Sequence, residues 1–325
     1  MSPTHRSARG RRALGALLLA SLSGCAAASP AAAQAAVPAP AERSAPVARA
    51  DTAALRHTLD SLADAHHGVV GYTVHNLDTG ERLERRGDET FPTASLIKVP
   101  ILVTVYDLVE RGELSLGDPL TILKIDQVPG SGVLQRFHNG TEITVGDAAW
   151  LMTIISDNTA TNLLLDRIVI RRVWDKMESL GLHHTKVHSK TFLRSSSVAM
   201  DSSVKYGLGV TTPNEMARLF ALLADGKAVS PRADSAMLDI LAANEDLQLL
   251  QRYVDGVRAP HKTGATDEVR TECTLWYLPA RVVACVLTKE NADTRWLIDN
   301  EAQLTMARMG EAIVQAWRAP TAGGG

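Results

Sequence analysis

The sequence has few aromatic residues and little net charge. Aromatic side chains make up 4% of its 325 residues, which argues against platforms for stacking nucleic-acid bases. The formal net charge is -2, so no excess of positive charge indicates a nucleic-acid partner. Hydrophobic residues at 45% and charged residues at 22% are typical of a globular protein long enough for a sizeable core.

Long hydrophobic runs are also scarce. The run over residues 13–23 follows a basic segment and is too short to cross a bilayer as a helix, which predicts a secretory signal over residues 1–25. It ends in Leu22-Ser23-Gly24-Cys25, which resembles the cleavage box of bacterial lipoproteins. We therefore expect lipidation at Cys25, with ordinary cleavage near residues 31–36 as the alternative. The protein would be exported to the periplasm or cell envelope, with a lipid anchor as its membrane contact.

Composition divides the rest of the chain. Residues 26–50 are rich in Ala, Pro and Ser, which predicts a flexible linker before a domain over residues 51–320, and residues 321–325 form a tail. Only Cys273 and Cys285 remain in the domain, on two apolar runs joined by Pro279-Ala280. An exported protein permits a disulfide between them, but we favour two buried free thiols.

Hydrophobic periodicity predicts strands at both ends of the domain and helices between them. The two strand sets form one sheet only if the chain returns, so we expect an α/β (α+β) fold: an antiparallel sheet flanked by terminal helices, with an all-helical region over about residues 94–240. The expected strands cover residues 69–77, the segment after the turn at 78–80, 259–265, 271–278 and 281–288. The expected helices cover residues 51–67, 95–108, 144–155, 158–168, 171–180, a segment from 212, 231–254 and 298–317.

The segment Ser95-Leu96-Ile97-Lys98 is a candidate nucleophile and base. A serine hydroxyl attacks poorly until a base takes its proton, and residues i and i+3 share a helix face. Lys98 can be that base only if burial or nearby positive charge destabilises its ammonium. Apolar neighbours favour such burial. An N-cap serine beside a surface lysine is the alternative, and Ser202-Ser203-Val204-Lys205 has the same S-x-x-K spacing.

Two further motifs follow in order. In Ser156-Asp157-Asn158, Ser156 is suited to pass a proton between Lys98 and a leaving nitrogen, Asn158 to hold Lys98 and a substrate amide, and Asp157 to fix the loop through backbone N–H groups. A simple helix cap is the alternative there.

In Lys262-Thr263-Gly264, the lysine supplies charge, the threonine can bind a carboxylate, and the glycine lets substrate approach the backbone. Arg270 on the next strand is suited to pair with the same carboxylate.

Together the three motifs outweigh the structural alternatives. They follow one another at intervals of roughly sixty and then roughly a hundred residues, an order that is improbable by chance. The chain resembles class A β-lactamases and the related penicillin-binding DD-peptidases from about Asp51 to Trp317. Supporting matches are Phe91-Pro92-Thr93-Ala94, Pro129-Gly130-Ser131-Gly132, Asp157-Asn158-Thr159-Ala160-Thr161-Asn162 and Thr211-Thr212-Pro213.

The resemblance implies a role for each motif residue in opening a β-lactam amide. Ser95 would form the acyl-enzyme, Lys98 would act as base or relay, and Ser156 would protonate the leaving nitrogen. The backbone N–H groups of Ser95 and Ala265 would form the oxyanion hole. The residues expected to bind substrate are Asn158, Lys262, Thr263, Gly264 and Arg270.

One departure from the family concerns release of the acyl group. Class A enzymes carry a glutamate in a loop after the second motif, and its place here reads Lys190-Thr191-Phe192-Leu193-Arg194. Asp201 is the only acid between residues 182 and 213, so Asp201 and His188 are the candidate replacement bases. Without either, acylation is intact and release is slow.

Three functions therefore stay open: a serine β-lactamase, a D-Ala-D-Ala carboxypeptidase or transpeptidase, and a catalytically idle sensor of peptidoglycan or β-lactam. The expected partner is a β-lactam or a peptidoglycan stem peptide, bound by a monomer without a cofactor. His183, His184 and His188 cluster in sequence, but no recognised metal-binding pattern accompanies them, so we expect no metal site.

Overall fold

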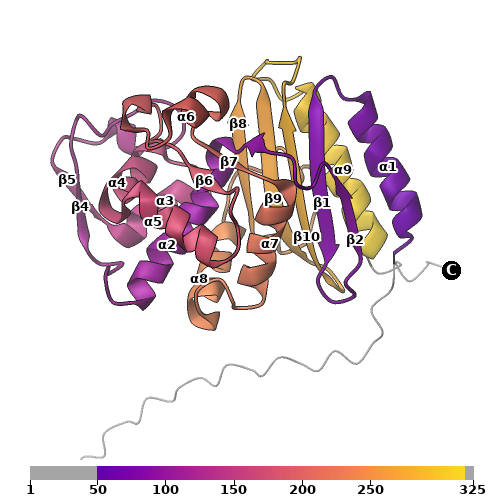
Figure 1. Cartoon of the computed structure of the whole chain (residues 1–325), viewed down its shortest axis with the longest axis horizontal. Helices are drawn as coiled ribbons and strands as arrows, with labels where there is room; N and C mark the ends of the chain where they lie inside the picture. Colours follow the sequence, from indigo (N-terminus) through magenta and orange to yellow (C-terminus); the bar gives the residue numbers. More distant parts are fainter. Residues whose placement is uncertain (1–49, 319–325) are drawn as a thin grey trace, which may run out of the picture. The chain divides into compact units, whose positions relative to one another are not determined.

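The computed structural model describes residues 50–318 and is built on a five-stranded antiparallel sheet in the order β2-β1-β10-β9-β8 (Figure 1). The strand β1 at the start of the domain pairs with β10 near its end, with Val69 opposite Lys289. The chain therefore returns as the strand pattern required, and the predicted fold class is confirmed. The strands are β1 (Val69–Asn76), β2 (Arg82–Arg85), β8 (His261–Thr266), β9 (Val269–Tyr277) and β10 (Arg281–Lys289).

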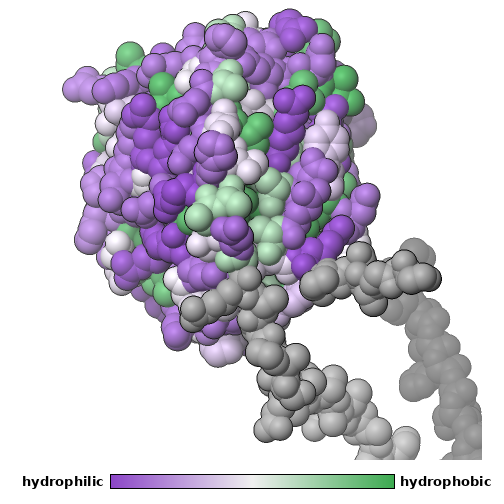
Figure 2. All heavy atoms as spheres, turned by 90° about the vertical axis from the view of Figure 1, so that its right-hand side faces the viewer, coloured by the Kyte–Doolittle hydropathy of each residue, from purple (hydrophilic) through white to green (hydrophobic). Residues whose placement is uncertain are grey.

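Helices α1 (Thr52–Ala65) and α9 (Glu301–Trp317) cover one face of this sheet (Figure 1). Asp51 caps α1 by accepting a hydrogen bond from the Ala54 N–H at 3.0 Å, as its position before the apolar pattern predicted. Leu59 and Ile313 pack with Trp276 in a buried apolar cluster between helices and sheet. The outer surface on this side is mostly hydrophilic, with a narrow hydrophobic strip (Figure 2), as expected for amphipathic helices with one buried face.

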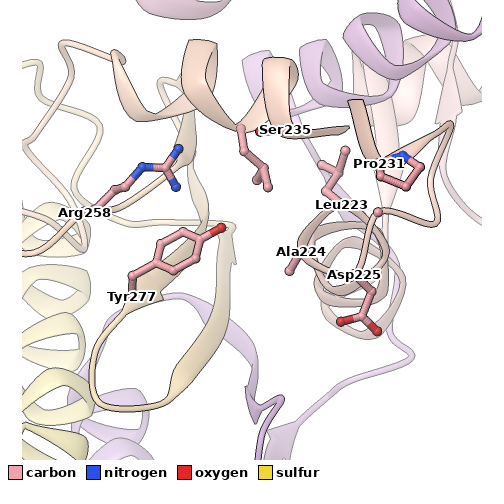
Figure 3. A pocket seen from close by; sticks show the side chains of 9 residues that line it. Leu223, Ala224, Asp225, Pro231, Ser235, Arg258 and Tyr277 are labelled. Carbon is pink, nitrogen blue, oxygen red and sulfur yellow. The ribbon is translucent and has the colours of Figure 1, made fainter. Parts of the chain in front are cut away.

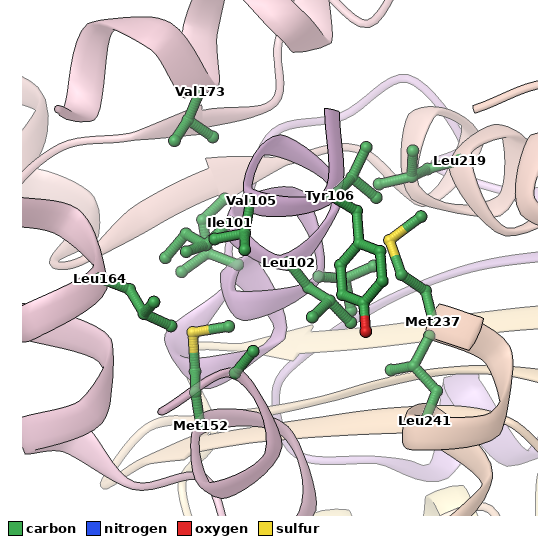
Figure 4. Packing of buried hydrophobic residues seen from close by; sticks show 14 of the residues in the cluster. Ile101, Leu102, Val105, Tyr106, Met152, Leu164, Val173, Leu219, Met237 and Leu241 are labelled. Atoms are coloured by element: carbon green, nitrogen blue, oxygen red, sulfur yellow. The ribbon is translucent and has the colours of Figure 1, made fainter. Parts of the chain in front are cut away.

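The opposite face of the sheet meets a helical region (Figure 1). Its central helix is α2, which is buried on all sides, since ten of its thirteen residues are inaccessible. In Figure 4 its Ile101 and Val105 point to the side of Leu164 and Met152, and its Leu102 lies beside Tyr106 on the side of Met237. The helices are α2 (Lys98–Glu110), α3 (Val145–Ile154), α4 (Asn158–Ile168), α5 (Ile170–Ser179), α6 (Met200–Tyr206), α7 (Pro213–Ala224) and α8 (Pro231–Ala242).

Short elements complete the helical region and hold the start of α2. Strand β3 precedes the 3₁₀ turn η1, which leads directly into α2, and β3 pairs with β7 in a small antiparallel sheet. The short strands are β3 (Phe91–Pro92), β4 (Pro119–Ile122), β5 (Thr141–Thr144), β6 (Lys186–Val187) and β7 (Gly209–Thr211). The 3₁₀ turns are η1 (Ala94–Ile97), η2 (Leu134–Arg136) and η3 (Arg194–Ser196).

One predicted helix is too long. The pattern over residues 231–254 predicted a single helix, but α8 ends at Ala242 and residues 243–254 are not helical. The Asn244 side chain donates to the Thr153 carbonyl at 2.9 Å and accepts from the Asp246 N–H at 2.9 Å. These bonds replace those that a continued helix would make, because asparagine competes with helical backbone pairing.

The preference for free cysteines is also wrong. Cys273 on β9 and Cys285 on β10 lie directly opposite each other, with their Cα atoms 4.1 Å apart, and form a disulfide. The hairpin register therefore supplies the pairing that two separate apolar runs left undecided.

Within residues 50–318, no helix combines the length and apolar character needed to cross a bilayer. The predicted signal, the lipidation site at Cys25, most of the linker and the tail lie outside the described residues.

Gly310 gives a stability prediction. A Cβ atom added there would lie 2.1 Å from the carbonyl oxygen of Leu250. Helix α9 can therefore pass the loop that contains Leu250 only with glycine at this position. Alanine normally stabilises a helix interior by about 1 kcal/mol relative to glycine. We expect Gly310→Ala instead to lower the free energy of unfolding in urea by about 2 kcal/mol or more. Gln315→Ala, at an exposed position of the same helix, serves as control and should change little; equal stability of both variants would contradict the close approach.

Candidate active site

Lys98 lies at the centre of the site, where the first two motifs meet. It is 1% exposed at the start of α2, and its Nζ donates to the Ser156 carbonyl at 2.6 Å, the Ser156 Oγ at 3.0 Å and the Asn158 Oδ1 at 2.9 Å. Burial lowers the pKa of Lys98 well below its usual value, and the charge of Lys262 lowers it further, while Asp157 opposes both effects. The three donations use all the protons of the ammonium form, and the lowered pKa shifts Lys98 toward the neutral amine that a general base requires.

Ser95 is placed by η1, which the sheet holds from the side. The Lys98 N–H donates to the Ser95 carbonyl, and residues three apart in a 3₁₀ turn project in the same direction. A Cβ on Gly264 of β8 would lie 2.4 Å from the Thr93 carbonyl oxygen and 2.8 Å from the Leu96 nitrogen. Only glycine therefore lets β8 contact the backbone that carries Ser95. This close approach also brings Ala265, the next residue of β8, to the same region.

Lys262 brings the third motif to the same hydroxyl. It is 1% exposed, and its Nζ donates to the Ser156 Oγ at 3.2 Å and to the Thr263 carbonyl at 2.9 Å. Burial lowers the pKa of Lys262 to about 8, against the opposing effects of Asp246 and Glu272. The Ser156 hydroxyl is thus in hydrogen-bond contact with two buried amines, one from each side of the site.

Ser156 is held in an unfavourable backbone conformation. Its φ is 58°, in the left-handed region that a non-glycine residue adopts only when its surroundings hold it there. Asp157 provides this hold: its buried carboxylate accepts from the backbone N–H groups of Val133, Leu134 and Ala160 at 2.6, 2.9 and 2.9 Å. The predicted loop-fixing role of Asp157 is therefore seen in its contacts.

Asn158 connects Lys98 to the loop at residues 129–132. Its Nδ2 donates to the Pro129 carbonyl at 3.0 Å, while its Oδ1 accepts from Lys98. Gly132 has a φ of 101°, and a Cβ there would lie 2.2 Å from the Asp157 carboxylate. The glycines of this loop therefore allow it to pack directly on the second motif.

Two expected substrate ligands are already bonded within the protein. The Thr263 hydroxyl donates to the Asp246 Oδ2 at 2.8 Å. Arg270 is 1% exposed, and its guanidinium donates to the carbonyls of Thr266, Val269 and Arg295 and stacks on Trp296 at 4.7 Å. Burial lowers the pKa of Arg270. Its predicted contact with a substrate carboxylate stays a prediction.

The two candidate deacylation bases lie apart from these groups. Asp201 is exposed in the first turn of α6. His188 is buried, its Nδ1 lies 3.1 Å from the Gly207 carbonyl, and burial lowers its pKa. Among the described hydrogen bonds and ion pairs, none joins either residue to Ser95, Lys98 or Ser156.

Thr191 occupies a position that sequence reasoning did not interpret. Asn162 lies one helical turn after Asn158 on α4; its side chain accepts from the Thr191 N–H at 2.7 Å and donates to the Thr191 carbonyl at 3.1 Å. The Thr191 hydroxyl is buried and has no hydrogen-bond partner among the described residues. The i, i+4 spacing of Asn158 and Asn162 was the signal for this second contact, since such residues share a helix face.

No group of three or more acidic, histidine or cysteine side chains within residues 50–318 is arranged to hold a metal ion. His184 instead contacts the carboxylate of Glu215 at 2.9 Å.

A cavity of about 320 Å³ lies elsewhere, between α7, α8 and the end of β9 (Figure 3). Its lining includes Leu223, Pro231 and Tyr277 and none of the motif residues. Its Arg258 already pairs with Asp239 at 2.5 Å. The chemistry of the motifs, rather than this cavity, therefore locates the candidate active site.

Taken together, these contacts bring the three motifs into one site. The chain matches the beta-lactamase enzyme family over residues 54–317 and belongs to that family. It is similar to beta-lactamase AER-1 of Aeromonas hydrophila, with 29% identity over 193 residues, 59% of this chain and 62% of that protein. It is also similar to the beta-lactamase regulatory protein BlaB of Streptomyces cacaoi, with 34% identity over 113 residues, 33% of this chain and 36% of that protein. Each of these two matches thus spans less than two thirds of the relative's length.

Solved structures agree over a greater share of their length. A beta-lactamase from Sphaerobacter thermophilus superposes with a TM-score of 0.73 at 31% identity, covering 82% of this chain and 97% of that one. A mutant of PBP-A, solved as an acyl-enzyme complex with penicillin G, superposes with a TM-score of 0.72 at 26% identity, covering 84% of this chain and 98% of that one.

The pKa of Lys262 can be measured without any substrate. Because burial favours its neutral form, we expect its side-chain signal in ¹³C-lysine NMR spectra to titrate with a midpoint near pH 8, while exposed lysines titrate near their usual value of about 10.4. The signal that disappears from the spectrum of the Lys262→Arg variant identifies the resonance of Lys262. A midpoint at the value of an exposed lysine would refute the burial of this amine.

Proposed function

We propose that the protein opens amide bonds of the β-lactam type by acyl transfer to Ser95. The observation that carries this proposal is the Ser156 hydroxyl in contact with Nζ of both Lys98 and Lys262. Such an arrangement serves proton transfer, whereas a helix cap or a solvated strand would need no pair of buried amines. Membership of the beta-lactamase enzyme family supports the same reaction.

In the acylation step, Ser95 Oγ attacks the substrate carbonyl as neutral Lys98 takes its proton. The developing oxyanion would be bound by the backbone N–H groups of Ser95 and Ala265, which belong to the two elements in contact at Gly264. The positive charge of Lys262 would help to hold the carboxylate of the substrate. Thr263 would join it only by giving up its bond to Asp246, whereas Arg270 still has a buried Nε with no partner among the described residues.

The proton then returns to the leaving nitrogen through Ser156. Protonated Lys98 donates to the Ser156 Oγ, and Ser156 passes its own proton to the amide nitrogen as the C–N bond breaks. Lys262 favours this direction of transfer, because its charge disfavours a second ammonium at Lys98. The product of this half-reaction is an ester on Ser95.

Hydrolysis of that ester requires an activated water. The backbone position clamped by Asn162 carries the hydroxyl of Thr191 rather than a carboxylate, and a hydroxyl is a poor base at neutral pH. We therefore propose slow deacylation. The same observation favours a second candidate function, a penicillin-binding D-Ala-D-Ala carboxypeptidase or transpeptidase, and the structural similarity to PBP-A supports it.

A third candidate is a non-catalytic sensor of peptidoglycan or β-lactam, in keeping with the similarity to the regulatory protein BlaB. The buried Lys98 argues against it, because a binding protein gains nothing from an amine with a lowered pKa beside a serine. As to location, we propose an exported monomer, anchored to the envelope through lipid on Cys25.

One experiment separates these functions: incubation with a chromogenic cephalosporin while colour and protein mass are followed together. We expect one equivalent of colour at first, a mass adduct on Ser95, and slow turnover afterwards. Ser95→Ala should show neither adduct nor colour. Ser202→Ala, at the other S-x-x-K sequence, is the matched control and should behave as the wild type. Fast turnover with colour but no accumulated adduct would favour an efficient β-lactamase, and neither colour nor adduct would favour the sensor.

The rate at which the adduct decays tests the deacylation proposal. Thr191→Glu places a carboxylate on the clamped backbone, and a general base contributes about 10²–10⁴-fold to such a step. We expect adduct decay, measured by mass, to accelerate at least about tenfold. Asp201→Asn should leave it unchanged, since Asp201 is exposed and none of the described hydrogen bonds or ion pairs joins it to Ser95, Lys98 or Ser156. An adduct trapped by Asp201→Asn would instead identify Asp201 as the deacylating base.

A further inference from the structure

The hydroxyl of Thr263 has a single proton, and that proton is already donated in a hydrogen bond within the protein. Thr263 Oγ1 donates to Asp246 Oδ2 at 2.8 Å, across 17 residues of sequence. A hydroxyl donates one hydrogen bond, so a substrate carboxylate can take this donor only if the bond to Asp246 breaks. Asp246 is exposed and is therefore accessible to a bound substrate.

Asp246 is held in place rather than lying free on the surface. Its N–H donates to the buried Asn244 side chain at 2.9 Å, and its Oδ1 accepts from the Gln248 N–H at 3.3 Å. The adjacent Glu245 N–H donates to the Ile154 carbonyl at the end of α3. The segment that replaced the predicted helical extension thus presents one carboxylate to the third motif.

The charges around Asp246 have the pattern of an anion site that is already filled. Asp246 raises the pKa of Lys262 and of Arg270, against the larger effect of burial in both cases. Arg270 donates to three backbone carbonyls through Nη1 and Nη2, while its buried Nε has no partner among the described residues. A substrate carboxylate at this position would therefore meet a like charge and a donor that is already engaged.

We propose that Asp246 is a specificity-determining residue, which disfavours substrates with a carboxylate opposite Thr263 relative to substrates with an uncharged group there. An uncharged ester or amide leaves the Thr263–Asp246 bond intact and meets no like charge in Asp246. The inference rests on the proposed function, because it concerns how a substrate of the acyl-transfer reaction is selected.

The test compares two probes that differ at one group: a β-lactam as its free acid and the same β-lactam as its methyl ester. The second-order rate constant for adduct formation is measured for the wild type, Asp246→Asn and Asp246→Ala. The first substitution removes the charge, and the second also frees the Thr263 hydroxyl. Glu245→Gln, which removes a charge from the neighbouring exposed position, is the matched control.

We expect the rate constant for the acid to rise about tenfold in Asp246→Ala, which corresponds to about 1.4 kcal/mol, the scale of one hydrogen bond. Asp246→Asn should give a smaller rise, and the ester should change less than about twofold in either variant. In the wild type the disadvantage of the acid should shrink as salt is added, and this salt effect should be lost in both variants.

Three outcomes would overturn the inference: no change with the acid, a slower reaction with the acid, or an equal change with both probes. Each of these outcomes is measured on proteins that still form adducts, so none of them contradicts the proposal of acyl transfer. If instead no protein forms an adduct with either probe, the proposed function fails and this inference fails with it.

Discussion

The site depends on one hydroxyl, that of Ser156, which lies 3.0 Å from the Nζ of Lys98 and 3.2 Å from that of Lys262. Both amines are buried, so the protein bears the cost of removing two cations from water. It lowers that cost by weakening the tendency of each amine to hold a proton. The same burial that makes the pair expensive for stability therefore makes Lys98 suited to proton transfer, and stability and chemistry oppose each other at this point.

The surrounding structure exists in large part to hold that hydroxyl. Ser156 has an unfavourable φ, Asp157 binds three backbone N–H groups to keep the turn in place, and Gly132 allows the neighbouring loop to approach. On the other side, Gly264 allows β8 to contact the turn that carries Ser95. Three short motifs far apart in the sequence thus meet because small residues remove steric barriers between rigid elements.

Much of this could be predicted from the sequence. The strand and helix patterns indicated the antiparallel sheet, and the order of the motifs predicted that Lys98, Ser156 and Lys262 lie in one site. Local patterns gave wrong predictions where contacts between distant residues determine the structure. The contacts of Asn244 replace the helix predicted beyond residue 242, and the register of two strands pairs Cys273 with Cys285. Asp246 could not be foreseen, because its partner Thr263 is 17 residues away on a strand edge and no motif links the two.

The pairing of β1 with β10 also affects the order in which the protein can fold during its synthesis. The sheet joins the beginning of the domain to its end, and Lys262 lies 106 residues after Ser156. During synthesis the helical region, with Lys98 and Ser156, is made before β8, the strand that supplies the second amine. A ribosome-bound chain that stops before β8 therefore has Lys98 and Ser156 but lacks Lys262, and distant contacts of this kind form late in folding. The contact of one hydroxyl with two buried amines therefore cannot form until β8 has been synthesised.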